Sequence, residues 1–151
     1  MATRSLQTPI GWMRISASGT GITAINWGRA EAEDDTPELA EACAQLKAYF
    51  DGRLNVFDVP VHVQASEFQV RVCNAISAIP FGHTRTYGDL ARDLDAPAQA
   101  IGAGCGGNPI PVIIPCHRVL GATSLGGFSA RGGVETKVWL LKHEGAAGLL
   151  I

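Results

Sequence analysis

Residues 108–120 read NPIPVIIPCHRVL and form the most informative segment of the chain. Prolines at 109, 111 and 115 restrict the backbone dihedral φ around a run of β-branched residues. Cys116 follows the last of these prolines, and His117 comes next. The pattern predicts a stiff, extended segment that holds one thiol in a fixed place.

The pair Cys116–His117 suggests nucleophilic chemistry. A thiolate is the nucleophilic form of cysteine, and a nearby imidazole that accepts the proton lowers the free energy needed to form it. Consecutive side chains of a strand point to opposite faces, so we expect a water molecule to bridge the two. A cysteine in an apolar run is more often a small buried hydrophobe. His117 and Arg118 favour a site, because two polar residues in an apolar segment need partners.

Working outward, the second half of the chain reads as short helices between glycine and proline turns. Ser66 is placed to cap a helix that ends before the turn at residues 80–82. Further helices are predicted over residues 87–94, 98–105 and 134–143. The turn at residues 95–97 joins two of them into a possible helix-turn-helix, which by itself is a weak indication of DNA binding. We therefore predict a mostly α C-terminal domain over residues 63–151.

The first half has a different texture. Residues 11–27 read as a hairpin that turns near residues 17–21. Helical spacing of apolar residues over 37–50, after Thr36 as N-cap, predicts an amphipathic helix. Residues 55–63 predict one more strand. Residues 1–62 are thus expected to form an α/β domain, a small antiparallel sheet with one helix.

Composition limits the class of protein. A 46% hydrophobic and 17% charged share over 151 residues is typical of a globular chain. No apolar run approaches the roughly 18 residues of a membrane span, so we expect a soluble, cytoplasmic protein. The cysteines are single and lack zinc-finger spacing to histidine, which predicts free thiols, no structural metal and no cofactor. They are Cys43, Cys73, Cys105 and Cys116.

Charge argues against a strongly electrostatic nucleic-acid binder, since the net charge is −2. Its distribution is uneven. Residues 1–62 carry five Lys/Arg and eight Asp/Glu, a net −3, whereas residues 63–151 carry seven and six, a net +1. If DNA is the partner, the second half is expected to meet it.

The segment GNPIPVIIPCHRVL, followed by GGFS and then by WLLKHEG, resembles the O6-alkylguanine-DNA alkyltransferase (methylated-DNA–protein-cysteine methyltransferase) family. The resemblance runs from about Phe68 to Gly145, with a weaker likeness starting at PIGW, residues 9–12. It implies a ribonuclease H-like first domain and a winged-helix-like second domain. It also implies a monomeric DNA-repair protein that flips a damaged nucleotide and takes its alkyl group irreversibly, with O4-alkylthymine as a further candidate substrate.

The resemblance implies a role for each matching catalytic residue. Cys116 would accept the alkyl group, and His117 would take its proton through a water molecule. Glu144 would orient His117; its position after the last helix opposes the helix dipole, so it would gain from such a donor. Asn108 would brace the turn near Cys116. Tyr87 would crowd the flipped nucleotide and give a proton to the leaving guanine.

The same likeness implies a base-binding pocket. The carbonyls of Cys116 and Val119 would accept hydrogen bonds from the exocyclic amine of the base. Ser129 would donate to its oxygen, and Phe128 and Pro111 would form apolar walls. By residue type alone, a serine in a glycine-rich loop is an ordinary turn residue.

The DNA contacts are expected from the helix over residues 98–105, which would enter the minor groove of double-stranded DNA. Ala98 and Ala100 are small enough to approach the sugar edges, and Arg118 is assigned a DNA contact. Gln99 stands where relatives place an intercalating arginine. Glutamine can still donate to the orphaned base, but it lacks the charge, so we expect weaker DNA affinity.

Three alternatives remain at this level. A non-catalytic alkyltransferase-like protein would bind lesions without repair, although such proteins replace the acceptor cysteine. A cysteine hydrolase would use Cys116, His117 and Glu144 as a triad and turn over repeatedly. A helix-turn-helix module would have no chemistry.

A second departure from the family, Ala130–Arg131, falls in the loop expected to line the pocket.

Overall fold

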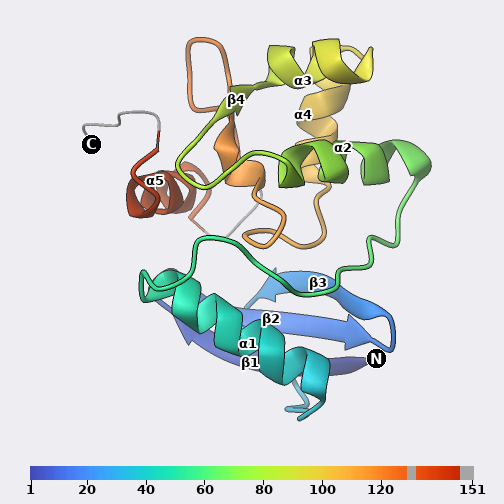
Figure 1. Ribbon diagram of the computed structural model, residues 1–151, viewed down its shortest axis with the longest axis vertical. Coiled ribbons are helices and arrows are strands. Elements are labelled where there is room, and N and C mark those ends of the chain that lie inside the picture. The colour runs from blue at the N-terminus through green and yellow to red at the C-terminus, as the bar shows by residue number, and fades with distance from the viewer. Residues whose placement is uncertain (129–131, 147–151) are drawn as a thin grey trace. The chain divides into compact units, whose positions relative to one another are not determined.

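The computed structural model describes residues 1–128 and 132–146 of the chain. It divides into two compact units, Met1–Gln64 and Ala65–Ile151 (Figure 1). The division falls two residues after the boundary expected at residue 62. Cys116 and the residues around it belong to the second unit.

The first unit is built on a three-stranded antiparallel sheet in the order β1-β2-β3. Strand β2 (Gly11–Ser18) and strand β3 (Gly21–Trp27) form the predicted hairpin. Strand β1 (Ala2–Thr8) pairs with β2 and was not predicted. Its sequence ATRSLQT has too few apolar residues for the alternation that marks a strand, and its place is decided by backbone pairing with β2.

Helix α1 (Pro37–Phe50) confirms the predicted helix and lies across the sheet (Figure 1). The Thr36 hydroxyl accepts a hydrogen bond from the Leu39 amide at 3.3 Å, which satisfies one of the free donors at the helix start. The face towards the sheet carries the buried residues Leu39, Ala42, Cys43, Leu46, Tyr49 and Phe50. Burial of these side chains is the main stabilising contribution of the unit.

The prediction of a strand over residues 55–63 is wrong. Only Val61 forms a bridge, a parallel one with Ile22. The Ile22 amide donates to Pro60 O at 2.9 Å, and the His62 amide donates to Ile22 O at 2.8 Å. Because Pro60 has no N–H, the ladder cannot extend through it, and the segment remains irregular.

The second unit is mostly helical (Figure 1). Its helices are α2 (Glu67–Ser77), α3 (Tyr87–Leu94), α4 (Ala98–Gly106) and α5 (Val134–His143), with the short 3-10 helix η1 (Cys116–Arg118). Strands β4 (Arg85–Thr86) and β5 (Val119–Leu120) pair in parallel. The predicted helix pair over residues 87–105 is therefore present. Within the described ranges, no helix is long and apolar enough to cross a membrane.

Local signals explain the geometry of the α3–α4 pair. Thr86 and Asp89 form a reciprocal capping box that fixes the start of α3. Asp95 ends the helix in the left-handed conformation, with φ of 51°, and reverses the chain towards α4. Leu90 of α3 and Ile101 of α4 are fully buried. The pair is thus held both by its turn and by its packing.

Candidate active site

The segment before Cys116 is a tight turn, which corrects the extended segment predicted from its prolines. The Ile114 amide donates to Ile110 O at 2.9 Å, and Val112 has φ of 74°. A positive φ is strained for a β-branched residue and persists only where the surroundings enforce it. Cys116 and His117 then follow in η1 rather than in a strand, so their side chains are not on opposite faces of a sheet.

Asn108 is the residue that enforces this turn. Its Nδ2 donates to Ile114 O at 2.8 Å, and its Oδ1 accepts from the Ile110 amide at 3.0 Å. Its side chain also hydrogen-bonds the Cys116 thiol. One amide thus connects both arms of the turn to the sulfur, which is the bracing position that the family resemblance implied.

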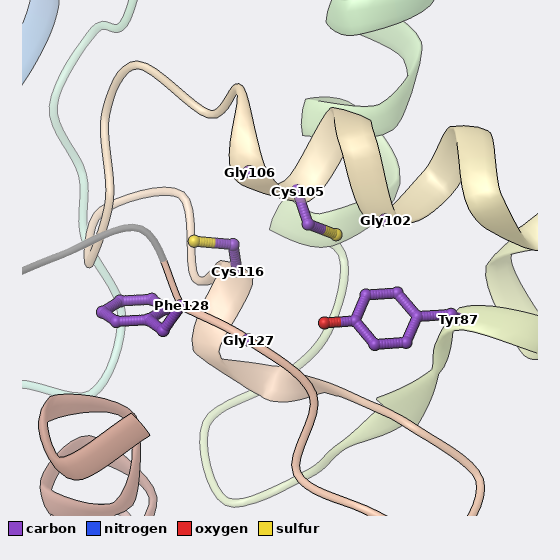
Figure 2. Close-up of a pocket in the computed structure, with 7 residues that line it drawn as sticks. All are labelled: Tyr87, Gly102, Cys105, Gly106, Cys116, Gly127 and Phe128. Atoms are coloured by element: carbon purple, nitrogen blue, oxygen red, sulfur yellow. The ribbon is translucent and has the colours of Figure 1, made fainter. Parts of the chain in front are cut away.

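Cys116 opens onto a cavity of about 360 Å³ (Figure 2). Tyr87 enters from the start of α3, and its hydroxyl points into the cavity (Figure 2). Helix α4 contributes one wall and the loop before α5 another. The lining residues are Tyr87, Gly102, Cys105, Gly106, Cys116, Gly127 and Phe128.

Cys116 is 7% exposed, and burial raises the pKa of its thiol to about 11. The hydrogen bond from Asn108 and the charge of Lys137 act in the opposite direction but do not cancel this effect. The sulfur therefore carries its proton at neutral pH. Its proton must leave during the reaction, so a base has to be close.

His117 and Glu144 form a fully buried pair. His117 Nε2 lies 2.8 Å from Glu144 Oε2, and both side chains have no exposed area. Burial lowers the pKa of His117, so the ring is neutral and Nε2–H donates to the carboxylate. Among the described residues, His117 Nδ1 is the buried side-chain nitrogen or oxygen that has no hydrogen-bond partner. This nitrogen is available to accept a proton.

The surroundings of Arg118 contradict the prediction that it contacts DNA. The residue is 6% exposed, and its guanidinium is used inside the unit. Nε donates to Glu144 Oε1 at 2.8 Å, Nη2 donates to Glu144 Oε2 at 2.9 Å, and Nη1 donates to Ile79 O at 2.6 Å. Such a forked pair is the strongest way to hold a buried carboxylate ionised, and it leaves no charge free for a phosphate.

Tyr87 is positioned by the loop opposite to it. A Cβ atom on Gly126 would lie 2.5 Å from the tyrosine oxygen, so glycine is required for this close approach. Burial raises the pKa of Tyr87, and the nearby Cys105 and Cys116 raise it further. The phenol therefore keeps its proton and can act as a hydrogen-bond or proton donor.

The remaining predicted pocket residues are distributed differently. Phe128 lines the cavity (Figure 2). Pro111 and Val119 are buried and do not line it, and Val119 O already accepts from Lys137 Nζ at 2.7 Å. Ser129 and Ala130–Arg131 lie outside the described residues.

The predicted DNA-contacting helix borders the cavity. In α4, Ala98 and Gln99 are exposed and Ala100 is half-buried, so the start of the helix is free to meet a partner. Further along the same helix, Gly102 and Cys105 line the cavity. A nucleic acid bound along α4 would therefore pass the mouth of the Cys116 pocket.

Besides the glycines that line the cavity, the side chains of Lys137 and Cys105 were missed from the sequence. Lys137 is fully buried, and its Nζ donates to Val119 O at 2.7 Å and Gly127 O at 3.1 Å. Its position four residues before Leu141 and seven before Glu144 puts it on their helix face, which is the signal that could have found it. Cys105 follows the buried Ile101 by four residues and could have been placed in the same way.

The fold and this pocket define a two-unit protein whose second unit carries a buried cysteine, a histidine–carboxylate pair and a helix-turn-helix. Two family models match the chain. Residues 1–63 match the ribonuclease-like domain of 6-O-methylguanine DNA methyltransferase, and residues 67–146 match its DNA-binding domain. The chain belongs to the 6-O-methylguanine DNA methyltransferase family.

Individual relatives agree with this membership. The chain is 37% identical to a methylated-DNA–protein-cysteine methyltransferase of Methanosarcina acetivorans, over 93% of this chain and 96% of the relative. A protein of the same name from Mycobacterium bovis is 38% identical, over 93% and 90%. The structure of Mycobacterium tuberculosis OGT in complex with DNA is similar with a TM-score of 0.86 and 38% identity, covering 96% of this chain and 93% of that one.

Proposed function

We propose that this protein repairs DNA by direct reversal, transferring an alkyl group from O6-alkylguanine to the sulfur of Cys116. The observation that carries the proposal is the geometry around one thiol. Cys116 faces a cavity that also holds the Tyr87 hydroxyl, and the neighbouring His117 has a free, buried Nδ1. Relatives that share more than a third of the sequence are named methylated-DNA–protein-cysteine methyltransferases.

The proposed transfer starts with the proton of Cys116. It passes through a water molecule to His117 Nδ1, and Glu144 stabilises the imidazolium that forms. Arg118 keeps the Glu144 carboxylate ionised and in place through two hydrogen bonds. This arrangement supplies a base at neutral pH even though the thiol itself is a weak acid.

Sulfur then attacks the alkyl carbon while the bond from that carbon to the guanine oxygen breaks. Tyr87 gives a proton to the departing guanine, and the proton that His117 took from Cys116 then returns through water to the Tyr87 phenolate, so both residues end in their starting protonation states. The product is a thioether on Cys116 and an intact guanine. No described side chain of the pocket is a nucleophile suited to cleave a thioether, so each molecule reacts once.

DNA binding is assigned to the second unit, and the first unit is a separate α/β domain. A base stacked in duplex DNA hides its exocyclic oxygen, so the nucleotide must be flipped into the cavity. We assign the minor-groove contact to α4, with Ala98 and Ala100 at the sugar edges and Gln99 beside the orphaned base. The lack of a cationic side chain at position 99 predicts modest affinity.

The base would be held by groups that the family resemblance implies. The carbonyl of Cys116 would accept from the exocyclic amine, and Ser129 would donate to the oxygen. Phe128, which lines the cavity, would provide an apolar contact. We further propose that the protein acts as a cytoplasmic monomer.

The test is an intact-mass measurement after incubation with duplex DNA that carries O6-methylguanine. We expect the protein to gain one methyl group on Cys116 and the DNA to regain guanine in equal amount. Cys116→Ser should bind the same DNA without either change. Binding without mass gain by the unmodified protein would support a non-catalytic lesion binder, and turnover beyond one equivalent would support a hydrolase; either result would refute the proposal.

A further inference from the structure

Gln69 of α2 joins that helix to the end of α4. Its Nε2 donates to Gly104 O at 2.8 Å and to Cys73 Sγ at 3.4 Å. Gly104 lies in the last turn of α4, where a helix leaves its carbonyls without partners inside the helix. The Gln69 amide therefore caps the end of α4 from a neighbouring helix, and it does so outside the machinery described so far.

The two helices are in close contact where this hydrogen bond forms. Val72 is three residues after Gln69 and thus on the same face of α2. It packs against Gly104, where an added Cβ would lie 2.9 Å from both of its methyl carbons. A Cβ on Gly107 would lie 2.7 Å from Gln69 Oε1. The amide thus fits against the last turn of α4, with its nitrogen at one glycine and its oxygen beside another.

The last turn of α4 leads directly into the active site. Cys105 in this turn lines the cavity (Figure 2). Asn108 follows the helix, and its backbone amide donates to Cys105 O at 3.3 Å. The Asn108 side chain hydrogen-bonds the Cys116 thiol. Gln69 is therefore connected to the sulfur through one helical turn and one side chain.

We propose that Gln69 is a positioning residue for alkyl transfer, which fixes the last turn of α4 and, through that turn, the Asn108 side chain that donates to the Cys116 thiol. The inference deepens the proposed function and rests on it for its role in repair. Gln69 does not itself line the cavity, so its effect passes through Asn108. The Asn108 bond lowers the pKa of Cys116, so weakening it reduces the ionised fraction at neutral pH and slows attack on the alkyl carbon.

Other groups also surround the Cys116 thiol. The titratable and charged residues on the elements around it are Cys73 of α2, Tyr87 of α3, Cys105 of α4, His117 and Arg118 of η1, and Lys137 of α5. Gln69 donates to one of them, Cys73. Burial raises the pKa of Cys73 and the bond from Gln69 lowers it, so a variant without that bond keeps Cys73 neutral. A change in the ionisation of Cys116 would therefore not come from a new charge on Cys73.

The test measures the reactivity of Cys116 without DNA. Alkylation of Cys116 by iodoacetamide is followed by peptide mass spectrometry from neutral to alkaline pH. Gln69→Met keeps the length of the side chain but removes the donor. We expect the profile to move to higher pH by about half a unit, so that the rate at neutral pH falls about threefold.

The sign of the change separates positioning from loss of stability. A substitution that only destabilised the unit would speed alkylation, because unfolding exposes the buried thiol. Asn74→Leu makes a comparable change from amide to apolar side chain at an exposed position of α2, and as the matched control it should behave like the unmodified protein. An unchanged or faster rate in Gln69→Met would overturn the proposal.

Gly107→Ala tests the same contact from the side of α4. Gly107 has φ of −89°, which alanine adopts without strain, and the added methyl group would displace the flexible end of Gln69. We expect this variant to slow alkylation about as much as Gln69→Met. In a Gln69→Ala background, where that space is empty, Gly107→Ala should slow alkylation no further. Additive effects of the two substitutions would contradict the contact.

A final comparison tests the path through Asn108. In an Asn108→Ala background the donor to the thiol is absent, so Gln69→Met should have no further effect on the alkylation rate. A second threefold fall would show that Gln69 acts by another route and would overturn the proposal. Because these assays use no DNA, failure of the proposed function alone would appear as absent methyl transfer with the Gln69 effect intact.

Discussion

The carboxylate of Glu144 organises the chemistry of the site at the scale of single residues. Its Oε2 accepts from His117 Nε2 at 2.8 Å and from Arg118 Nη2 at 2.9 Å. Arg118 holds the carboxylate ionised, and the carboxylate in turn fixes the His117 tautomer that leaves Nδ1 free. The arginine that sequence reasoning assigned to DNA thus contacts Glu144, and Glu144 in turn contacts His117.

Replacing Arg118 tests this role. Arg118→Met should lower the free energy of unfolding by about 3–5 kcal/mol, because Glu144 would be left as a buried, uncompensated charge. Denaturant titration measures this loss, and adding Glu144→Gln to the same protein should recover part of it.

The salt dependence of DNA binding separates the two interpretations of Arg118. A phosphate contact contributes to the slope of affinity against salt, whereas a buried partner of Glu144 does not. We therefore expect the slope for the double variant Arg118→Met with Glu144→Gln, which removes the positive charge at position 118, to match that of the unmodified protein. A slope smaller in magnitude by about one would instead support the predicted contact between Arg118 and DNA.

At the scale of elements, two glycines of helix α4 have different surroundings, one in a helix–helix contact and one at the cavity. Gly104 packs against α2, where an added Cβ would lie 2.9 Å from both Val72 methyl carbons. Gly102 faces the cavity, where an added Cβ would meet nothing within 4 Å. One helix therefore combines a close helix–helix contact with open space at the site.

These two glycines form a matched pair for a stability prediction. Gly104→Ala should destabilise the unit by about 1–3 kcal/mol through overpacking against Val72. Gly102→Ala should stabilise it by about 0.5–1 kcal/mol, because alanine loses less backbone entropy in a helix. Chemical denaturation of both variants measures the difference, and equal effects would contradict the packing argument.

At the scale of the whole molecule, the described catalytic groups belong to one unit, so protonation of the site affects the stability of that unit. Burial lowers the pKa of His117 below its ordinary value of 6.5. The unfolded chain therefore binds a proton that the folded unit does not, once the pH falls below about 6.5. The stabilising contribution of neutral His117 is complete above that pH and is lost as the pH falls towards the folded pKa.

We accordingly expect the second unit to lose stability from about pH 6.5 downward, with an uptake of about one proton on unfolding. Hydrogen exchange of amides in α5, followed across this range, reports the opening of the unit. His117→Gln should flatten the dependence between about pH 6.5 and 5, above the range of the carboxylates. A dependence that survives this substitution would assign it to another group.

Much of the fold was predictable because its signals are local. Helix α1 begins after Thr36, α2 after Ser66 and α3 after Thr86, each with a hydroxyl that accepts from the first turn. The strand expected over residues 55–63 failed because Pro60 interrupts the ladder, and β1 was missed because its strand character comes from pairing with a neighbour.

What the sequence determined by itself is therefore the set of capped helices. Through the family resemblance it also predicted that Cys116, His117 and Glu144 act together. Tertiary structure alone decided that the active-site segment turns into η1, that Arg118 faces Glu144, and that Lys137 lies behind the cavity. The reason is physical. Capping and periodicity act between residues a few positions apart, whereas burial, which sets the pKa of Cys116 and the partners of buried charges, depends on segments that meet only in the folded unit.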